Sequence, residues 1–280
     1  MDIGIIQSLR GTTDLDAAFT RMLQMGIRSC QLCCWERKLF HTPGAAEWVL
    51  EKLEQYGITL SAFWCGWEGR RVWDFYEGQI TLGLVPVDTR AERVQMLLEG
   101  SDFAKKLGAK YMATHVGYMP ENPLDPNYHG VLNACKTVAA RCKENGQVFL
   151  FETGQETPVT LLRAMQDIER SVGEGTVGIN LDPANLILYG KGNPVDALDV
   201  FGKYVGGVHG KDGLYPTDGN HLGRETPLGQ GKVNYPAFIR RLKEVGYTGP
   251  ITIEREISGE EQTRDILAAK ALLEKLDADT

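Results

Sequence analysis

The feature that most restricts how this chain can fold is a repeated alternation of two kinds of segment. Short apolar runs alternate with amphipathic segments of helical period, and the pair recurs eight times along the sequence. The expected strands are 2–7, 28–35, 58–67 and 109–117, followed by four runs that reach Glu152, Asp182, His209 and Glu254. Such β-rich runs, bounded by Gly or Pro, are typical of parallel strands buried on both faces.

The expected helices are 15–25, 45–57, 90–108, 128–145, a segment that follows Pro158, 194–204, 235–245 and 260–276. No linker or change of composition divides the chain, and α/β barrels of 280 residues commonly form one unit. We therefore expect one domain, residues 1–280, folded as a single (β/α)8 TIM barrel. The alternative is a doubly wound open sheet. That fold normally carries a glycine fingerprint after its first strand, and the segment IIQSLRGTTD lacks one.

Charge and composition argue against several functional classes. The formal net charge is −7, whereas a protein that binds a phosphate backbone needs a basic face, so we expect no nucleic-acid partner. No apolar run approaches the roughly 20 residues of a membrane span, and the start MDIGIIQSLRG lacks the form of a signal peptide. Six unevenly spaced cysteines indicate reduced thiols. These observations predict a soluble cytoplasmic protein without a membrane partner.

Four polar residues stand at the ends of the last four expected strands, namely Glu152, Asp182, His209 and Glu254. In a closed parallel barrel, reactive groups lie at these carboxyl ends of the strands. Any one of them alone is explained equally well as a cap on the following helix. Four in phase on consecutive strands are harder to explain that way, because buried ionisable groups are costly unless they are paired or bind metal. We expect the four side chains to surround one divalent cation.

The segments FETGQET, INLDPANL, VHGKDG, RETPLGQGKVNY and GPITIERE resemble the xylose-isomerase-like TIM-barrel superfamily, in particular its sugar phosphate isomerase/epimerase branch. That branch includes ketose 3-epimerases, hydroxypyruvate isomerases and the inosose enzymes. The resemblance implies that Glu152, Asp182, His209 and Glu254 bind one divalent metal ion. Three carboxylates and one imidazole form a hard donor set, so we expect Mn²⁺, with Co²⁺ or Mg²⁺ as alternatives.

The resemblance also implies an activity. The protein would be a metal-dependent epimerase or isomerase of a ketose or keto-sugar, and whether that sugar is phosphorylated stays open. Glu152 and Glu254 would exchange a proton with the substrate through a metal-stabilised enediolate, with the direction of transfer unassigned. A 1,2-isomerase could use the same pair. Relatives are commonly dimers or tetramers, so the resemblance implies a homo-oligomer.

Three other functions stay open at this point. A dehydratase or lyase acting on a keto-inositol or keto-sugar would begin with the same proton abstraction. An AP endonuclease-like hydrolase ranks low, because that branch needs three zinc ions and further His ligands where this chain has Asn185 and residues 223–225. A non-enzymatic sugar-binding barrel would require the four ligands to be vestigial.

Three residues near these motifs are candidates for substrate contacts. Arg224 opens a segment resembling the family pattern R-x-x-P-x-G-x-G, in which the Arg holds substrate oxygens; a solvated loop arginine is the alternative. Lys211 lies two residues beyond His209 and could reach the substrate or a neighbouring carboxylate. Asn185 stands where the family often has His, so a polar contact is retained while an acid/base role there is in doubt.

Three more candidates have structural explanations of equal weight. His115 ends the fourth expected strand and lines the mouth of the barrel or packs as a core histidine. Glu156 touches substrate hydroxyls or merely begins the fifth helix. Trp64 forms a wall against the C–H face of a sugar or packs in the core. The long aromatic stretch 69–88 is a substrate lid, an oligomer contact or a passive insertion.

Overall fold

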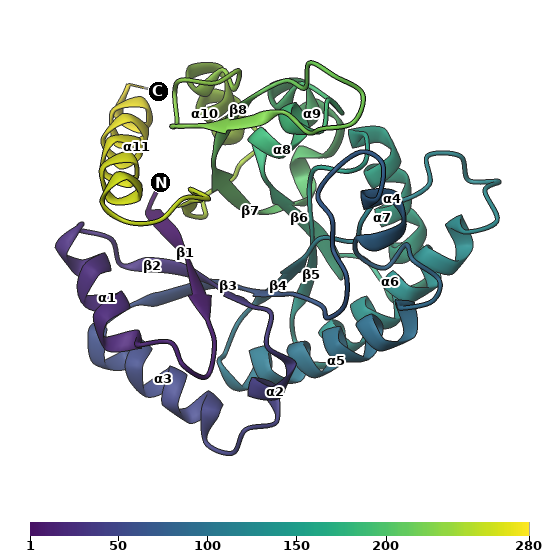
Figure 1. Ribbon diagram of the computed structural model, residues 1–280, viewed down its shortest axis with the longest axis horizontal. Helices are drawn as coiled ribbons and strands as arrows, with labels where there is room; N and C mark the ends of the chain where they lie inside the picture. The colour runs from purple at the N-terminus through teal and green to yellow at the C-terminus, as the bar shows by residue number, and fades with distance from the viewer. Residues whose placement is uncertain (280) are drawn as a thin grey trace.

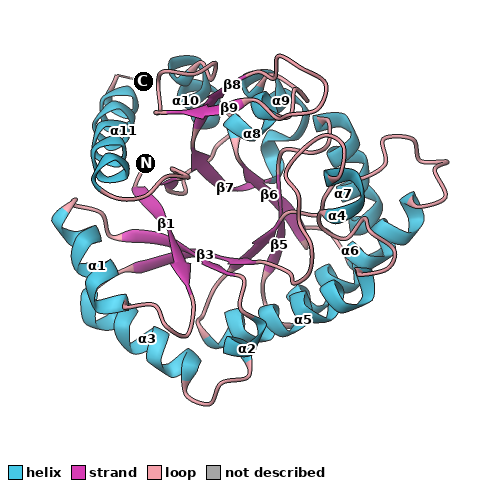
Figure 2. Cartoon of the chain, viewed as in Figure 1, coloured by secondary structure: helices cyan, strands magenta, loops and turns pink. Residues whose placement is uncertain are grey.

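The computed structural model describes residues 1–279, which form a closed barrel of eight parallel strands (Figure 2). In chain order the strands are β1 (Ile3–Leu9), β2 (Ser29–Cys34), β3 (Thr59–Cys65), β4 (Tyr111–Thr114), β5 (Val148–Glu152), β6 (Val177–Leu181), β7 (Val205–Gly210) and β10 (Ile251–Ile253). The barrel closes where β1 pairs in parallel with β10, with Ile3 opposite Ile251 and Ile5 opposite Ile253. The predicted (β/α)8 barrel is confirmed, and the open doubly wound sheet is excluded by this closing pair.

Helices surround the barrel, and the two ends of the chain lie side by side (Figure 1). The main helices are α1 (Leu15–Gln24), α3 (Ala45–Tyr56), α5 (Arg90–Lys106), α6 (Tyr128–Glu144), α7 (Pro158–Val172), α9 (Pro194–Phe201), α10 (Tyr235–Glu244) and α11 (Glu260–Ala278). Their positions agree with the expected segments to within a few residues. No helix within residues 1–279 is long and apolar enough to cross a membrane.

Short elements that the sequence did not predict complete the fold. They are α2 (Arg37–Phe40), α4 (Gly78–Thr81), α8 (Pro183–Leu188), the 3-10 turn η1 (Gly202–Tyr204), and the strands β8 (Asp212–Leu214) and β9 (Arg224–Thr226). β8 and β9 pair as an antiparallel hairpin in the connection between β7 and α10. Elements this short carry too few residues to show a period, so their sequences do not reveal them.

Several strand-to-helix turns are determined locally by capping residues followed by proline. The side chains of Thr157, Asn193 and Asn234 each accept a hydrogen bond from a backbone N–H in the first turn of α7, α9 and α10. Each of these helices also has Pro in its first turn, where the missing N–H costs nothing. These turns begin each helix soon after the preceding strand or loop, which keeps the strand ends together on one face of the barrel.

The alternation of side chains along the strands determines which residues reach the barrel axis. On β5, Phe149 and Phe151 are fully buried in the layer between barrel and helices, whereas Leu150 packs inside the barrel with Trp64 and Ala113. Glu152, two residues after Leu150, therefore faces the axis at the carboxyl end of its strand. The same alternation on the neighbouring strands brings their polar residues to this end.

Candidate active site

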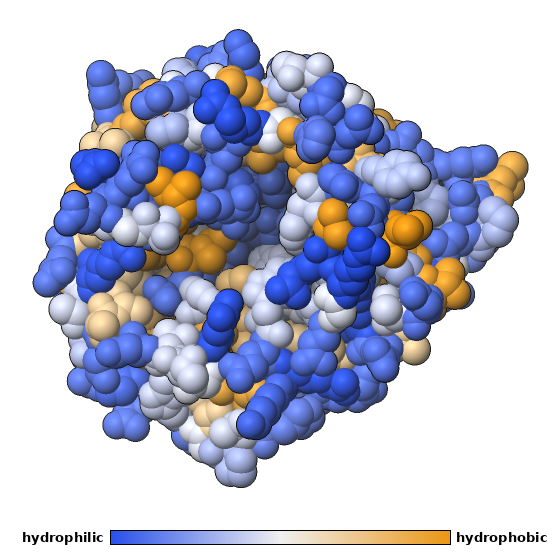
Figure 3. All heavy atoms as spheres, viewed as in Figure 1, coloured by the Kyte–Doolittle hydropathy of each residue, from blue (hydrophilic) through white to orange (hydrophobic). Residues whose placement is uncertain are grey.

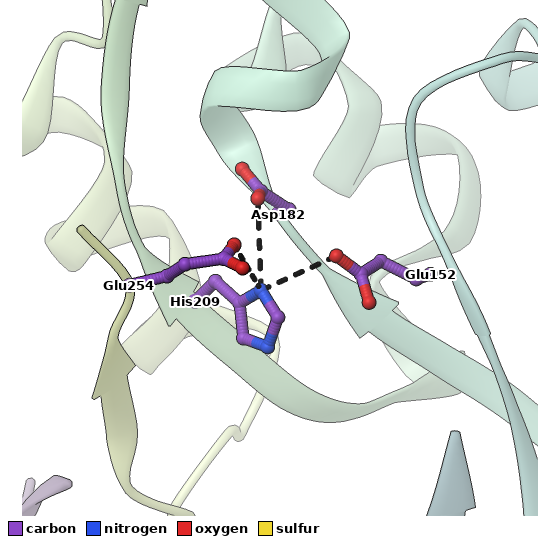
Figure 4. Close-up of side chains that lie close together, drawn as sticks. All are labelled: Glu152, Asp182, His209 and Glu254. Atoms are coloured by element: carbon purple, nitrogen blue, oxygen red, sulfur yellow. Dashed lines mark ion pairs between the residues drawn. The ribbon is translucent and has the colours of Figure 1, made fainter. Parts of the chain in front are cut away.

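The four predicted ligands converge at the carboxyl end of the barrel. Each of Glu152, Asp182, His209 and Glu254 offers one ligand atom, and these atoms lie within 4.8 Å of one another. They come from the ends of β5, β6, β7 and β10, and Figure 4 shows their side chains pointing toward a common centre. Nδ1 of His209 lies 3.5 Å from Oε1 of Glu152, 3.6 Å from Oδ2 of Asp182 and 3.3 Å from Oε2 of Glu254.

The donor set fits a divalent cation. Nδ1 of His209 and Oδ2 of Asp182 are both buried, and neither has a hydrogen-bond partner. Buried polar atoms are normally satisfied, and three carboxylates so close together repel one another unless positive charge lies between them. The oxygen-rich set suits a hard ion such as Mn²⁺ or Mg²⁺. The role of the four residues as ligands stays a prediction.

Asp182 combines the two roles that the sequence analysis treated as alternatives. Its Oδ1 accepts a hydrogen bond of 2.9 Å from the backbone N–H of Asn185 and so caps α8. Its Oδ2 is left facing His209 and has no hydrogen-bond partner. Helix capping and a place in the cluster are therefore compatible, because each uses a different oxygen.

The ring of His209 is contacted at Nε2 by two amide side chains that were not predicted, those of Gln31 and Asn180. Oε1 of Gln31, on β2, lies 2.7 Å from Nε2 of His209. Nδ2 of Asn180 lies 2.9 Å from the same ring nitrogen, and Oδ1 of Asn180 accepts a hydrogen bond of 3.3 Å from Nε2 of Gln31. A proton on Nε2 donated to Gln31 leaves the lone pair of Nδ1 facing the carboxylates, which is the state a metal ligand requires. The sequence signal that could have identified Gln31 is that a polar residue stands inside an otherwise apolar strand.

Burial and charge move the pKa values of the two glutamates in opposite directions. Burial raises the pKa of Glu152, and the nearby Glu254 and Asp182 raise it further against the opposing effect of His115 and His209. Burial would also raise the pKa of Glu254, but Lys211 and His209 outweigh it and hold that pKa well below the ordinary value. A bound cation would favour the ionised form of both carboxylates.

Lys211 is buried beside the cluster and is surrounded by acids. Its Nζ lies 3.0 Å from Oε2 of Glu254, 2.7 Å from Oε1 of Glu256 and 3.6 Å from Oδ2 of Asp182. Burial lowers the pKa of this ammonium, but Glu254, Glu256 and Asp182 together raise it well above its usual value. The salt bridge left open by the sequence is therefore present, and the same side chain also lines the adjacent cavity.

A cavity of about 380 Å³ opens beside the cluster, in a face that Figure 3 shows hollowed near its centre. Glu152 and Glu254 both line it. Its apolar walls include Trp35, Trp64, Trp73, Leu188, Tyr189 and Leu222. A concave, mainly aromatic site with a few convergent polar groups is the usual form of a small-molecule site.

Three predicted substrate contacts surround the carboxylate of Glu152 and line this cavity. The indole N–H of Trp64 donates to Oε2. Nδ2 of Asn185 donates to Oε1 at 3.4 Å, and Nε2 of His115 lies 3.4 Å from the same oxygen. Nδ1 of His115 is buried and has no hydrogen-bond partner. The structure thus places Trp64, Asn185 and His115 where they can hold Glu152 and face a bound molecule.

Two other predicted contacts lie outside the cavity lining. Arg224 is the first residue of β9 and is exposed, whereas Thr226, two residues further along the same strand, is buried. Glu156 is buried just before α7, and neither of its carboxylate oxygens has a hydrogen-bond partner. Burial raises the pKa of Glu156 to about 8. The structure does not bring either side chain to the four-residue cluster.

The long β3–α5 connection covers one side of the cavity. Its Trp73 lines the cavity and lies 5.2 Å from the ring of His115. The connection is held by Arg93 of α5, which donates hydrogen bonds to the backbone carbonyls of Glu68, Arg70, Thr81 and Gly83. The guanidinium of Arg93 also stacks over Trp67 at 4.2 Å. The position of this connection agrees with a wall or lid over the site, and Arg93 was not predicted.

Comparisons with known proteins agree with this architecture. The family described as xylose isomerase-like TIM barrel matches residues 19–276. A xylose isomerase domain protein from Planctomyces limnophilus is 34% identical, with a TM-score of 0.89 over 98% of this chain and 96% of that one. The chain is also similar to D-psicose 3-epimerase from Clostridium cellulolyticum H10, a structure with D-tagatose (14% identity, TM-score 0.71, 99% of both chains).

Two further similarities concern proteins without a stated activity. A xylose isomerase-like TIM barrel protein from Mycobacterium smegmatis, in complex with magnesium, is 18% identical, with a TM-score of 0.67 over 95% of this chain and 90% of that one. An uncharacterized protein from Methanocaldococcus jannaschii is 26% identical over 197 residues, or 65% of this chain. That match spans 61% of the relative's own length.

Proposed function

The chain belongs to the xylose isomerase-like TIM barrel family, and on that premise we propose that it is a divalent-metal-dependent epimerase or isomerase of a ketose or keto-sugar. The observation that carries the proposal is the convergence of Glu152, Asp182, His209 and Glu254 beside a cavity that two of them line. The similar D-psicose 3-epimerase adds support from the sugar chemistry of a protein with the same fold.

The four side chains would hold one metal ion, and we propose Mn²⁺ as that ion. The lack of a hydrogen-bond partner at Nδ1 of His209 and Oδ2 of Asp182 supports a bound divalent cation, as does the magnesium complex of the similar Mycobacterium smegmatis protein. The choice of Mn²⁺ rests on the oxygen-rich donor set. When bound, the cation would polarise a substrate carbonyl and stabilise negative charge on its oxygen. Cytoplasmic location and a homo-oligomeric state stay predictions from the sequence.

Glu152 and Glu254 are the proposed bases. One carboxylate takes the proton from the carbon beside the substrate carbonyl, and the bonding electron pair moves toward the carbonyl oxygen to give an enediolate. The other carboxylate returns a proton to the opposite face of that carbon, so the composition of the sugar is unchanged. Return of the proton to the neighbouring carbon would instead give a 1,2-isomerisation.

The neighbours of the two bases keep their carboxylates in place. Hydrogen bonds from Trp64 and Asn185 orient Glu152, and the ammonium of Lys211 lies 3.0 Å from Glu254. Orientation of this kind matters because proton transfer requires the base to lie within hydrogen-bond reach of the C–H group. Both bases are thus positioned by groups that the fold already holds in place.

A solvent-exchange assay tests the proposal. Metal-free protein is given Mn²⁺ or a chelator and incubated in D₂O with a panel of ketoses, keto-inositols and their phosphates. We expect metal-dependent deuterium at the carbon beside the carbonyl, together with an epimer or isomer as product. Glu152→Gln and Glu254→Gln should each abolish the exchange, and persistent exchange in both variants would refute the assigned bases. Loss of a hydroxyl group from the product would identify a dehydratase instead.

A further inference from the structure

We propose that the substrate of this site is an uncharged sugar rather than a sugar phosphate, an inference that rests on the proposed function and names its substrate class. Many (β/α)8 barrels hold a phosphate on backbone N–H groups in the loops that follow the seventh and eighth barrel strands. The corresponding Gly-rich loop here runs from 227 to 232, after the β8–β9 hairpin. The backbone N–H groups of Gly229 and Gly231 in this loop are already occupied.

The occupant is the carboxylate of Asp212, which is buried at the start of β8. Its Oδ2 accepts hydrogen bonds of 2.9 Å from the backbone N–H groups of Gly229 and Gly231. Its Oδ1 accepts from those of Gly213 at 2.8 Å and Val233 at 3.0 Å. Four converging N–H groups form the kind of concavity that binds anions, and the chain fills this one with its own carboxylate.

The Gly-rich loop packs closely against the carboxylate of Asp212. A Cβ atom added to Gly231 would lie 2.1 Å from Oδ1 of Asp212, so the loop backbone is packed directly against the carboxylate. Gly229 has a φ of +87°, a conformation that glycine adopts without strain. The G-x-G sequence is thus explained by the approach of the loop to Asp212, and it does not require a phosphate ligand.

The charge of the cavity points the same way. Among the residues 1–279 that the structure describes, Lys211 is the only lysine or arginine that lines the cavity, and it already contacts Asp182, Glu254 and Glu256. The carboxylates of this region belong to Glu152, Asp182, Glu254 and Glu256. Their four negative charges exceed by one the three positive charges of Lys211 and a divalent cation together. A phosphate dianion would therefore meet a site of its own sign.

The walls of the cavity suit an uncharged ring. Trp35 and Trp64 lie 4.9 Å apart between ring centroids, and Trp73 lines the same cavity with its ring 5.2 Å from that of His115. Aromatic faces bind the apolar C–H surface of a sugar, while His115 and Asn185 offer hydrogen bonds to its hydroxyl groups. Arg71, the cation stacked 4.4 Å over Trp35, is exposed and lies outside the cavity lining.

Matched pairs of sugars test this inference in the Mn²⁺-loaded protein. D-fructose is compared with its 1-phosphate and its 6-phosphate, and D-psicose and D-tagatose are compared with theirs, by deuterium exchange from D₂O. We expect at least one neutral ketose to exchange with kcat/KM at least about 10-fold higher than either of its phosphates, a difference of about 1.4 kcal/mol in transition-state binding. Equal or faster exchange of a phosphate would overturn the inference while supporting the proposed chemistry.

A binding experiment tests the substrate class independently of the proposed proton-transfer chemistry. Four of the five tryptophans lie in or beside the cavity, and Trp48 lies on α3. A Trp48→Phe variant therefore reports on the site through its intrinsic fluorescence. We expect neutral ketoses to change this fluorescence. Inorganic phosphate, up to tens of millimolar, should neither change the fluorescence nor compete with the ketoses for binding. If no sugar exchanges deuterium, the proposed function fails, but the inference about the substrate class is untouched. If phosphate competes with the ketoses, or if no neutral ketose changes the fluorescence, the inference is overturned.

Discussion

The side-chain oxygen of Gln31 lies 2.7 Å from Nε2 of His209, although the two residues are 178 positions apart in the chain. Both side chains are buried, one on β2 and one on β7, and they meet inside the barrel below the four-residue cluster. The contact gives His209 a fixed ring orientation in which Nδ1 faces Glu152, Asp182 and Glu254. Partners of this kind orient metal ligands in many proteins.

Replacing Gln31 by Ala should weaken binding of Mn²⁺ about 10- to 100-fold, because the ring of His209 loses the group that sets its protonated nitrogen. Calorimetric titration with Mn²⁺ measures the affinity, and ¹⁵N NMR of the histidine ring reports the tautomer. Gln95→Ala is the matched control, because Gln95 is exposed on α5 and donates a hydrogen bond to Glu99 of the same helix. Unchanged affinity and tautomer in the Gln31 variant would show that the contact has no part in orienting His209.

Replacing Trp64 by Phe should reduce kcat/KM for the sugar substrate about 10- to 100-fold while leaving the aromatic wall in place. The variant removes the N–H that donates to Glu152, and a lost hydrogen bond to a charged group costs on the order of 1.5–3 kcal/mol. Steady-state kinetics with Mn²⁺ measures the effect, and Trp48→Phe serves as the control. A Trp64→Phe enzyme with full activity would show that Glu152 needs no orientation from this residue.

Glu156 should make the stability of the protein depend on pH. Burial raises the pKa of its carboxyl to about 8 in the folded protein, whereas an unfolded glutamate titrates near 4.5. The folded state therefore binds more protons between these values. The free energy of unfolding contributed by this group is highest at or below about pH 4.5, and it falls as the pH rises toward 8.

A Glu156→Gln variant should flatten this dependence and be more stable than the parent at pH 8.5, by on the order of 1–4 kcal/mol. Urea unfolding at pH 5.5, 7 and 8.5 measures the difference, and the exposed Glu51→Gln provides the matched control. If the parent and the Glu156→Gln variant lose stability equally between pH 5.5 and 8.5, the carboxyl of Glu156 is not the titrating group.

Arg93 should determine the stability of the β3–α5 connection. Replacement by Met removes the hydrogen bonds to four backbone carbonyls and the stacking on Trp67, at an expected cost of about 2–5 kcal/mol in the free energy of unfolding. Limited trypsin digestion should also cleave faster at the exposed Arg70 and Arg71. Arg264→Met, which changes an exposed arginine on α11, is the control. Cleavage at the parent rate would show that other contacts hold the connection.

Much of the fold was predictable because the repeating βα unit imposes its own geometry. Parallel strands joined by helices present all their carboxyl ends on one side, so residues that end consecutive strands must lie near one another. That rule is enough to group Glu152, Asp182, His209 and Glu254 from the sequence, and the structure brings the four side chains together. It also placed His115, Asn185 and Trp64 near the same rim, where they contact Glu152.

The contacts across the barrel and within its loops were not predictable in this way. Gln31 reaches His209 only because closure between β1 and β10 brings distant strands around one axis. Arg224 lies exposed on β9, and the antiparallel pairing of β8 with β9 was not predictable because strands this short show no period. Asp212 occupies the Gly-rich loop because the chain folds back over it after that hairpin.

The sequence by itself determined the barrel and the side chains at the carboxyl ends of its strands, because strand alternation and strand direction are local properties that the pattern of residues encodes. Only the tertiary structure decided which partner each of those side chains meets. Hydrogen bonds such as those of Gln31 and Asp212 depend on the separation of atoms far apart in the chain, and that separation exists only once the barrel is closed and its loops are packed.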